Sequence, residues 1–348
     1  MDTHGQEFPF EILDVEPVLA KELMEHYIGE KTGFVKVGPK GYFFQSMYKQ
    51  QAASIYSMPI RPDDVFVHSF PRSGTTLTQE LVWLIQNNLN YEKARSTKLY
   101  ARFPMLEFSL SMHPETTKEL IEEHKDKVDC LNILNTFATP SAEKIAKLPS
   151  PRFIKTHIPL SLLPPSLLDS AKVVHVARDP RDVAVSIYHL CRLLRTIGAA
   201  KDFKTHWNYF INDLIYWGPY FEHVKEAWNL RNHPNLLFIF YEDLTNNMPV
   251  VLRQIATFLG KSYTDEQINE LSNHLRFENF KRNPSVSQEV PNLNFLRNGE
   301  QSFLRKGKVG GWREDFDDEM RQQAERWIAD NLRDTDLRFP SYYKNNQE

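Results

Sequence analysis

The residues best suited to chemistry in this sequence lie in four short segments that combine cations, hydroxyl groups and glycine. The first runs from Phe70 to Thr76, with the sequence FPRSGTT, between an apolar run and a helical pattern. Glycine lets the backbone approach an anion closely, and free amides at a helix N-terminus bind phosphate. The segment therefore predicts a phosphate-binding loop, although a turn of this composition by itself is more often only structural.

This loop does not follow the Walker A pattern. That pattern requires glycine, lysine and then serine or threonine, after an earlier glycine and four intervening residues. Here Gly74 lies between Ser73 and Thr75, with Arg72 before them. A kinase of the P-loop type would also need an acidic strand end that holds Mg²⁺, and none is correctly placed. The sequence therefore disfavours a nucleoside-phosphate kinase.

The second segment contains Lys155 and His157. Both lie at the end of a predicted strand, where the alternation of side chains places them on the same side. A cation beside an imidazole suits removal of a proton from a hydroxyl while negative charge develops on a transferred group. The alternative is that His157 has only a structural role.

Two further segments are suited to binding a second anion. Arg178 follows a predicted strand and Ser186 lies in the next helix, so the pair could hold a phosphate. Alternatively, Arg178 pairs with Asp182 and Ser186 faces the core. The fourth segment, residues 303–312, combines three cations with glycines that let backbone amides face an anion. Because ligands of α/β proteins gather at the carboxyl ends of strands, the four segments together predict one site.

These segments alternate with the elements that must position them. Predicted strands cover residues 64–70, 152–156, 172–177 and 236–240, and predicted helices cover 77–85, 183–194, 250–259, 264–275 and 318–332. Thr264 and Gln267 form a capping box at the start of the fourth of these helices. The alternation predicts an α/β fold with a central, mainly parallel sheet flanked by helices.

No stretch resembles a linker, so the prediction is a single domain over residues 1–348. Its core is expected at about 60–335, with residues 1–59 as an N-terminal extension packed on the core. Residues 100–150 are less regular and rich in Phe, Leu and Met. They form either a lid over a substrate pocket or an ordinary helical excursion.

Composition narrows the function classes. The chain has 348 residues, of which 41% are hydrophobic and 25% charged, and its net charge of −3 disfavours general nucleic-acid binding. Two cysteines are too few for a disulfide framework, which indicates a reducing compartment. The N-terminus lacks a secretory pattern, and no window approaches the roughly 18 apolar residues of a membrane span. A cytoplasmic protein without a membrane span is therefore expected.

The ordered set of motifs resembles the cytosolic sulfotransferase family and is most similar to its insect members, including the retinol dehydratase type. The matching motifs are FPRSGTT at 70–76, KTH at 155–157, Arg178 with Ser186, FYED at 240–243, RKG at 305–307 and GGW at 310–312. The similarity extends from about Phe34 to Phe339. It implies a P-loop-like phosphosulfate-binding loop, 3′-phosphoadenosine 5′-phosphosulfate (PAPS) as co-substrate, and no metal.

The resemblance also implies a role for each matching residue. The 5′-phosphosulfate is expected at Arg72, Ser73, Gly74, Thr75 and Thr76; the 3′-phosphate at Arg178, Ser186, Arg305, Lys306 and Gly307; and adenine near Leu77, Tyr241 and Phe277. His157 is the expected general base, and Lys155 and Arg72 are expected to stabilise charge on the leaving group.

This sequence departs from the family pattern at several positions. Arg72 stands where the family usually has lysine, Leu77 where a tryptophan commonly stacks on adenine, and Leu275 where a threonine lies near adenine. Residues 316–318 read Phe-Asp-Asp instead of the family's dimerisation segment, so a homodimer formed by that route is not expected.

The expected acceptor is a small lipophilic compound with a hydroxyl group, such as a phenol, steroid or retinoid. The residues expected to line its pocket are apolar: Phe103, Met105, Leu106, Phe108 and Met112. Two alternatives remain: a retinol dehydratase-type reaction through a sulfated intermediate, and a catalytically silent protein that binds nucleotide or lipophile.

Overall fold

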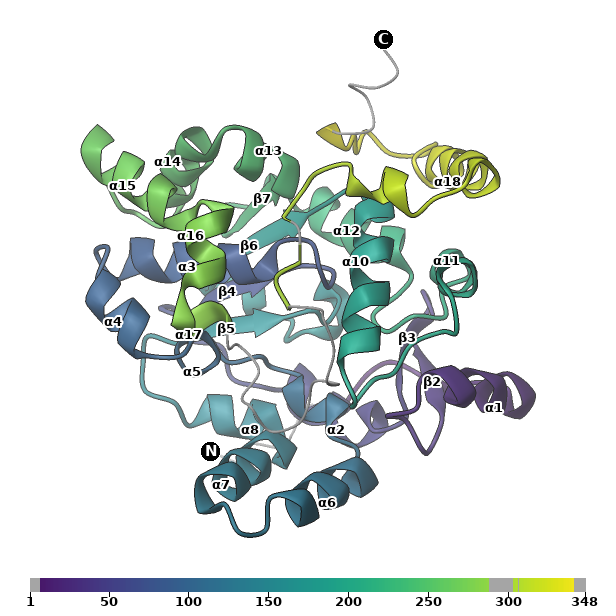
Figure 1. Ribbon diagram of the computed structural model, residues 1–348. Helices are drawn as coiled ribbons and strands as arrows, with labels where there is room; N and C mark the ends of the chain where they lie inside the picture. The colour runs from purple at the N-terminus through teal and green to yellow at the C-terminus, as the bar shows by residue number, and fades with distance from the viewer. Residues whose placement is uncertain (1–6, 288–302, 306, 341–348) are drawn as a thin grey trace.

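A parallel four-stranded sheet lies at the centre of the computed structural model, which describes residues 7–287, 303–305 and 307–340 (Figure 1). Its strands are β4 (Val65–His68), β5 (Phe153–Thr156), β6 (Lys172–Ala177) and β7 (Leu236–Phe240), in the order β5-β4-β6-β7. All four predicted strands are therefore confirmed, although the first two are shorter than expected.

The strands of this sheet are mostly apolar because both faces of the sheet are covered. Val65, Val67 and Val174 pack against α3, α14 and α15. Phe66 and Ile154 point to the opposite face and join a cluster with α2 and α8. In the view of Figure 1, α3, α14 and α15 lie on one side of the sheet, and α10, α12 and α18 lie on the other.

The helices that cover the central sheet and connect its strands have the following bounds. They are α3 (Thr75–Gln86), α4 (Tyr91–Ser96), α5 (Leu99–Arg102), η1 (Phe108–Ser111), α6 (Pro114–Glu123), α7 (Val128–Ala138), α8 (Ser141–Ala146), η2 (Leu160–Leu162), α9 (Leu167–Ser170), α10 (Pro180–Leu193), α11 (Phe203–Ile211), α12 (Tyr220–Asn229), α13 (Tyr241–Asn246), α14 (Met248–Phe258), α15 (Asp265–Leu275), α16 (Phe277–Arg282), α17 (Pro284–Ser287), η3 (Gly311–Glu314) and α18 (Asp318–Asn331). In the part of the chain described, none of them is long and apolar enough to cross a membrane.

The helix boundaries differ from the predicted ones where capping residues set the first turn. α3 begins at Thr75, two residues before the predicted start, because Gly74 adopts a left-handed conformation as its N-cap. α10 begins at Pro180, which suits the first helical position, after Asp179 caps the helix. The predicted capping box between Thr264 and Gln267 is present in α15.

The N-terminal region forms a second, antiparallel sheet that the sequence analysis did not predict. Its strands are β1 (Ile12–Asp14), β2 (Phe34–Val37) and β3 (Tyr42–Gln45), with α1 (Pro17–His26) and α2 (Tyr48–Tyr56). The Phe43 amide donates to the Gly218 carbonyl at 2.8 Å, and the Trp217 amide donates to the Phe43 carbonyl at 2.9 Å. These bonds attach the antiparallel sheet to the segment between α11 and α12.

A buried ion pair joins the starts of β4 and β5, the two strands that lead into the candidate site. Arg152 Nε donates to Asp64 Oδ1 at 2.7 Å, and a second guanidinium nitrogen donates to the other carboxylate oxygen. Arg152 also donates to the carbonyl of Pro59 at 2.7 Å. Neither charged side chain reaches solvent, so each depends on the other for compensation.

Replacing Asp64 by alanine should therefore lower the free energy of unfolding by roughly 3–5 kcal/mol, because it leaves the Arg152 guanidinium buried without a counter-ion. Asp63→Ala is the matched control, since Asp63 is exposed and should cost no more than about 0.5 kcal/mol. Urea unfolding of both variants measures the difference. Equal losses would show that the ion pair does not stabilise the strand starts.

Candidate active site

The carboxyl ends of all four parallel strands open at one edge of the sheet. β4 leads into the 69–76 loop, β5 into His157, β6 into Arg178, and β7 into Tyr241. Residues from all four connections line a single cavity of about 880 Å³. The sequence prediction that the motifs share one site is therefore confirmed for the segments described.

The 70–76 loop presents the N-terminus of α3 to this cavity. Gly74 has φ of 107°, and a Cβ atom there would lie 2.5 Å from the ring of Tyr241. Only glycine fits both requirements. Thr75, Thr76 and Leu77 line the cavity in the first turn of α3, where amides have no partner within the helix. The geometry suits a bound phosphate.

Ser73 differs from its neighbours in the loop. Its side chain is fully buried and does not line the cavity, and its hydroxyl has no hydrogen-bond partner among the described residues. The role expected for this side chain in holding the phosphosulfate stays a prediction.

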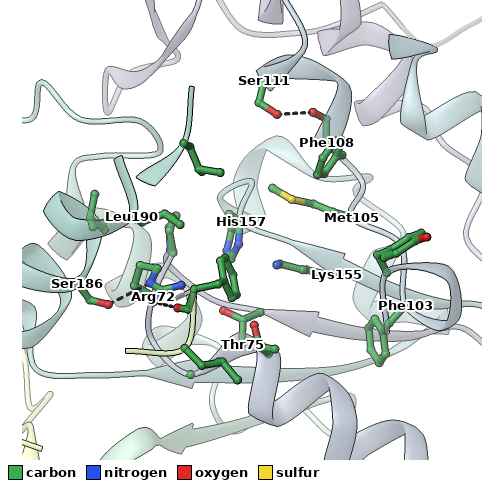
Figure 2. A pocket seen from close by; sticks show the side chains of 18 of the residues that line it. Arg72, Thr75, Phe103, Met105, Phe108, Ser111, Lys155, His157, Ser186 and Leu190 are labelled. Carbon is green, nitrogen blue, oxygen red and sulfur yellow. Dashed lines mark hydrogen bonds between the residues drawn. The ribbon is translucent and has the colours of Figure 1, made fainter. Parts of the chain in front are cut away.

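Arg72 connects the loop to two other segments of the site. Its Nε donates to Ser186 Oγ at 3.0 Å, as Figure 2 shows, and its Nη2 donates to the Phe303 carbonyl at 2.9 Å. The guanidinium also lies 4.8 Å from the centre of the Phe303 ring. The backbone at Arg72 has φ of 68°, an unfavourable conformation for a side chain of this size. These contacts hold Arg72 at the cavity wall.

Arg178 lies against the same loop. It donates to the carbonyls of Arg72 and Lys308, at 3.2 and 3.0 Å, and its guanidinium covers the Tyr241 ring at 4.6 Å. It also lies 3.7 Å from Asp182, the pairing considered as the structural alternative. Arg178 nevertheless lines the cavity, and its Nε has no partner among the described residues. Pairing with Asp182 therefore does not remove Arg178 from the cavity wall.

The fourth predicted segment is held beside Arg178 by α10. Asp182 accepts the amides of Gly310 and Trp312 at 2.7 and 3.0 Å. Arg305 and Gly307 line the cavity, whereas Lys306 lies outside the described residues. Arg276, which the sequence analysis did not single out, adds another cation to this wall.

Aromatic rings close the end of the cavity near this segment. A Cβ atom on Gly307 would lie 2.3 Å from the Phe277 ring, so the ring packs directly on the glycine backbone. The Tyr241 hydroxyl donates to the Gly307 carbonyl at 3.3 Å. Leu77 and Leu275 line the same cavity. The arrangement provides flat apolar surfaces beside the cations.

His157 lies just beyond β5 and is fixed at three points. Its Nδ1 is 2.8 Å from the Ser69 carbonyl, an acceptor, so Nδ1 carries the proton and Nε2 keeps a lone pair. Its amide donates to Glu107 at 2.6 Å, and its carbonyl accepts from His223 at 2.9 Å. Burial, followed by the nearby Lys155 ammonium, lowers the pKa of His157 well below its usual value. The imidazole is therefore neutral and can accept a proton.

Glu107 was missed by the sequence analysis. It is almost fully buried and lines the cavity, and it accepts the Thr156 hydroxyl at 2.9 Å in addition to the His157 amide. Burial raises its pKa to about 7. The sequence signal that could have identified Glu107 is its place within an apolar run. A charged residue is rarely buried there unless it is paired with another group.

Three further histidines pack beneath the turn that carries His157. His68 has Nε2 2.9 Å from the Ile158 carbonyl, so this nitrogen is protonated and Nδ1 accepts from His175 at 2.8 Å. The His68 and His223 rings stack at 4.8 Å. Burial lowers the pKa of His68, His175 and His223, so a neutral, hydrogen-bonded layer supports the turn.

The part of the cavity beyond His157 is apolar, and Figure 2 shows Phe103, Met105 and Phe108 around it. These residues and Met112 line the cavity as predicted, but the prediction for Leu106 was wrong. Met105 pairs with Lys155 in an extended segment, so the next side chain points away into the core. The opposite wall, which the sequence analysis did not identify, consists of Leu190, Leu194, Ile197, Tyr216 and Trp217.

Among the described residues, no group of three or more His, Cys, Asp or Glu side chains could hold a metal ion.

Comparison with known proteins adds a family assignment. The sulfotransferase domain family matches residues 62–336. The luciferin sulfotransferase of Photinus pyralis is 30% identical over 326 residues, covering 92% of this chain and 84% of that protein. Mouse sulfotransferase 1A1 is 31% identical over 276 residues, covering 79% and 84%. A crystal structure of retinol dehydratase with androsterone and the inactive cofactor PAP has a TM-score of 0.89 and 47% identity, covering 95% of this chain and 98% of that one.

The geometry of the loop gives a direct test. Gly74→Ala should weaken binding of adenosine 3′,5′-bisphosphate by about tenfold or more, because the added Cβ collides with Tyr241 and φ is left-handed. Gly33→Ala is the control: Gly33 has φ of 100° but nothing within 4 Å of an added Cβ, so affinity should not change. Isothermal titration calorimetry measures both. Unchanged affinity in Gly74→Ala would remove the loop from the anion site.

Proposed function

Because this chain belongs to the sulfotransferase domain family, we propose that its cavity brings PAPS to the hydroxyl of a small lipophilic acceptor, with His157 as general base. The chain is a PAPS-dependent sulfotransferase of lipophilic alcohols. The observation that carries the residue assignment is the single cavity, in which an anion-binding wall meets an apolar channel at His157.

His157 removes the proton in this proposal. The acceptor oxygen attacks the sulfur of PAPS as its proton passes to His157 Nε2, and the bond between sulfur and the bridging oxygen breaks. The products are a sulfate ester and adenosine 3′,5′-bisphosphate. The hydrogen bond from Nδ1 to the Ser69 carbonyl keeps the ring in the tautomer that this step requires.

Arg72 and Lys155 stabilise the charge that develops on the bridging oxygen. Both line the cavity beside the α3 N-terminus, and charge stabilisation by groups already in place requires little reorganisation. Arg72 cannot supply a proton to the leaving oxygen, because a guanidinium remains charged. Its contribution is therefore electrostatic.

The nucleotide occupies the wall formed by the remaining cations and rings. The 5′-phosphosulfate lies at the α3 N-terminus, and Arg178, Ser186, Arg305 and Gly307 hold the 3′-phosphate. Arg178 supports this assignment because its guanidinium lines the cavity beside the 70–76 loop, where it can form charge-assisted hydrogen bonds to a phosphate. Adenine packs between Phe277 and Tyr241, near Leu77.

The acceptor lies in the apolar channel. Structures of a 47% identical retinol dehydratase with androsterone, and of retinol dehydratase with retinol, support an acceptor of steroid or retinoid size. If it is an allylic alcohol such as retinol, its sulfate ester can ionise to a conjugated cation, and loss of water becomes the net reaction. The resemblance to retinol dehydratase favours this second candidate.

We place the protein in the cytoplasm, in keeping with its two unpaired cysteines. Dimerisation through residues 316–318 is not part of the proposal. Phe316 is buried and packs edge-on against Trp207 and Trp312 of the same chain, so its side chain is not available to a partner.

His157→Gln should reduce kcat by roughly 10²- to 10⁴-fold, because glutamine lacks the imidazole Nε2 that takes the acceptor proton in this proposal. Affinity for adenosine 3′,5′-bisphosphate should stay within about twofold, since His157 does not belong to the phosphate-binding wall. His233→Gln, at a histidine that does not line the cavity, is the control. Transfer of labelled sulfate from PAPS to steroid and retinoid alcohols measures kcat.

The wild-type enzyme should also keep its activity at neutral pH and lose it only in acid. The base acts when unprotonated and its pKa is lowered, so activity falls as pH drops through that lowered pKa. Full turnover in His157→Gln would exclude the imidazole as the base.

A further inference from the structure

We infer that the apolar channel accepts a compound with a carboxylate at the end opposite its reacting hydroxyl, and that Lys144 binds this carboxylate. The inference rests on the proposed function, because it assigns the hydroxyl end of the acceptor to His157. It adds to the proposed function a second polar contact, between Lys144 and the acceptor, and a substrate class, the hydroxy acids.

Charged side chains are unevenly distributed around the cavity. The described Asp, Glu, Lys, Arg and His side chains on its wall are Arg72, Glu107, Lys144, Lys155, His157, Arg178, Asp182, Arg276, Arg305 and Lys308. Glu107, Lys155 and His157 surround the reacting centre. Six belong to the phosphate-binding wall: Arg72, Arg178, Asp182, Arg276, Arg305 and Lys308. Lys144 is the remaining one, and it lies on α8 among apolar residues.

The Lys144 ammonium has no anionic partner among the described residues. Among the described residues, its hydrogen-bond partner is the Thr136 carbonyl, and no carboxylate forms an ion pair with it. The side chain is half-buried, and burial lowers its pKa. A cation that has lost part of its hydration without gaining a counter-ion is unfavourable. An anionic group on the ligand would compensate for this loss.

A series of side-chain and backbone contacts connects the reacting centre to Lys144. Glu107 binds the His157 amide, and the next residue, Phe108, packs against Phe137 with ring centres 4.4 Å apart. Thr136, which precedes Phe137, accepts the hydrogen bond from Lys144. Ile133, Ile145 and Leu148 line the cavity near this end. An apolar chain between hydroxyl and carboxylate would follow this surface.

A neighbouring lysine shows that the position of Lys144 is specific. Lys147 lies one turn later, at the C-terminal cap of the same helix, and is exposed. It does not line the cavity. Lys147 therefore provides a matched control with the same charge and nearly the same place in the chain.

The test compares ω-hydroxydodecanoate with its methyl ester, which keeps the length and the hydroxyl but removes the negative charge. Affinities are measured by calorimetry on the enzyme saturated with adenosine 3′,5′-bisphosphate. The acid should bind about fivefold more tightly than the ester, the effect expected of one partly exposed ion pair. Lys144→Gln should abolish this preference, and Lys147→Gln should retain it.

Equal binding of acid and ester to the wild type, or a preference that survives in Lys144→Gln, would overturn the inference. Lys144→Glu provides a second check, because it replaces the cation by an anion. This variant should bind the cationic ω-aminododecanol more tightly than the anionic ω-hydroxydodecanoate. Sulfate transfer to the methyl ester separates the two proposals. Transfer without an acid preference contradicts only the Lys144 assignment, whereas an acid preference without transfer to either compound contradicts the proposed function.

Discussion

The function depends on a constraint of parallel sheets: the carboxyl ends of all the strands lie at the same edge. The order β5-β4-β6-β7 places the phosphate-binding loop of β4 between the strands that lead to His157 and Arg178. Side chains buried on both faces of the sheet fix the strands in this arrangement. The proposed anion-binding and proton-removing residues therefore line one cavity.

The cations that suit the nucleotide also keep the base neutral. Lys155 disfavours a proton on His157, and burial acts in the same direction. A hydrogen bond holds the imidazole, from Nδ1 to the Ser69 carbonyl, and two hold the His157 backbone, from its amide to Glu107 and from His223 to its carbonyl. Burial raises the pKa of Glu107 to about 7. The base is thus positioned by its backbone and Nδ1, which leaves Nε2 for the acceptor. Beyond it the cavity wall is mostly apolar.

Much of this arrangement could be predicted because it is local in sequence. The strands are short runs rich in apolar residues, and the FPRSGTT loop has the composition of a phosphate site. The groups that were missed act over long sequence distances: Glu107 meets His157 only because the segment after Pro104 pairs with β5, and Trp217 reaches the channel through contacts with β3. The prediction for Leu106 failed for the same reason. The direction of its side chain is set by the pairing of Met105 with Lys155, which no local sequence pattern indicates.

The most direct test of the account is the stoichiometry of the reaction with labelled PAPS and a panel of retinol, a hydroxysteroid and a phenol. The account predicts one adenosine 3′,5′-bisphosphate released for each acceptor molecule consumed, with sulfate on the product or, for retinol, a product that has lost water. Release of bisphosphate that no acceptor accelerates would contradict it, because the cavity would then bind the nucleotide without delivering its sulfuryl group to a hydroxyl.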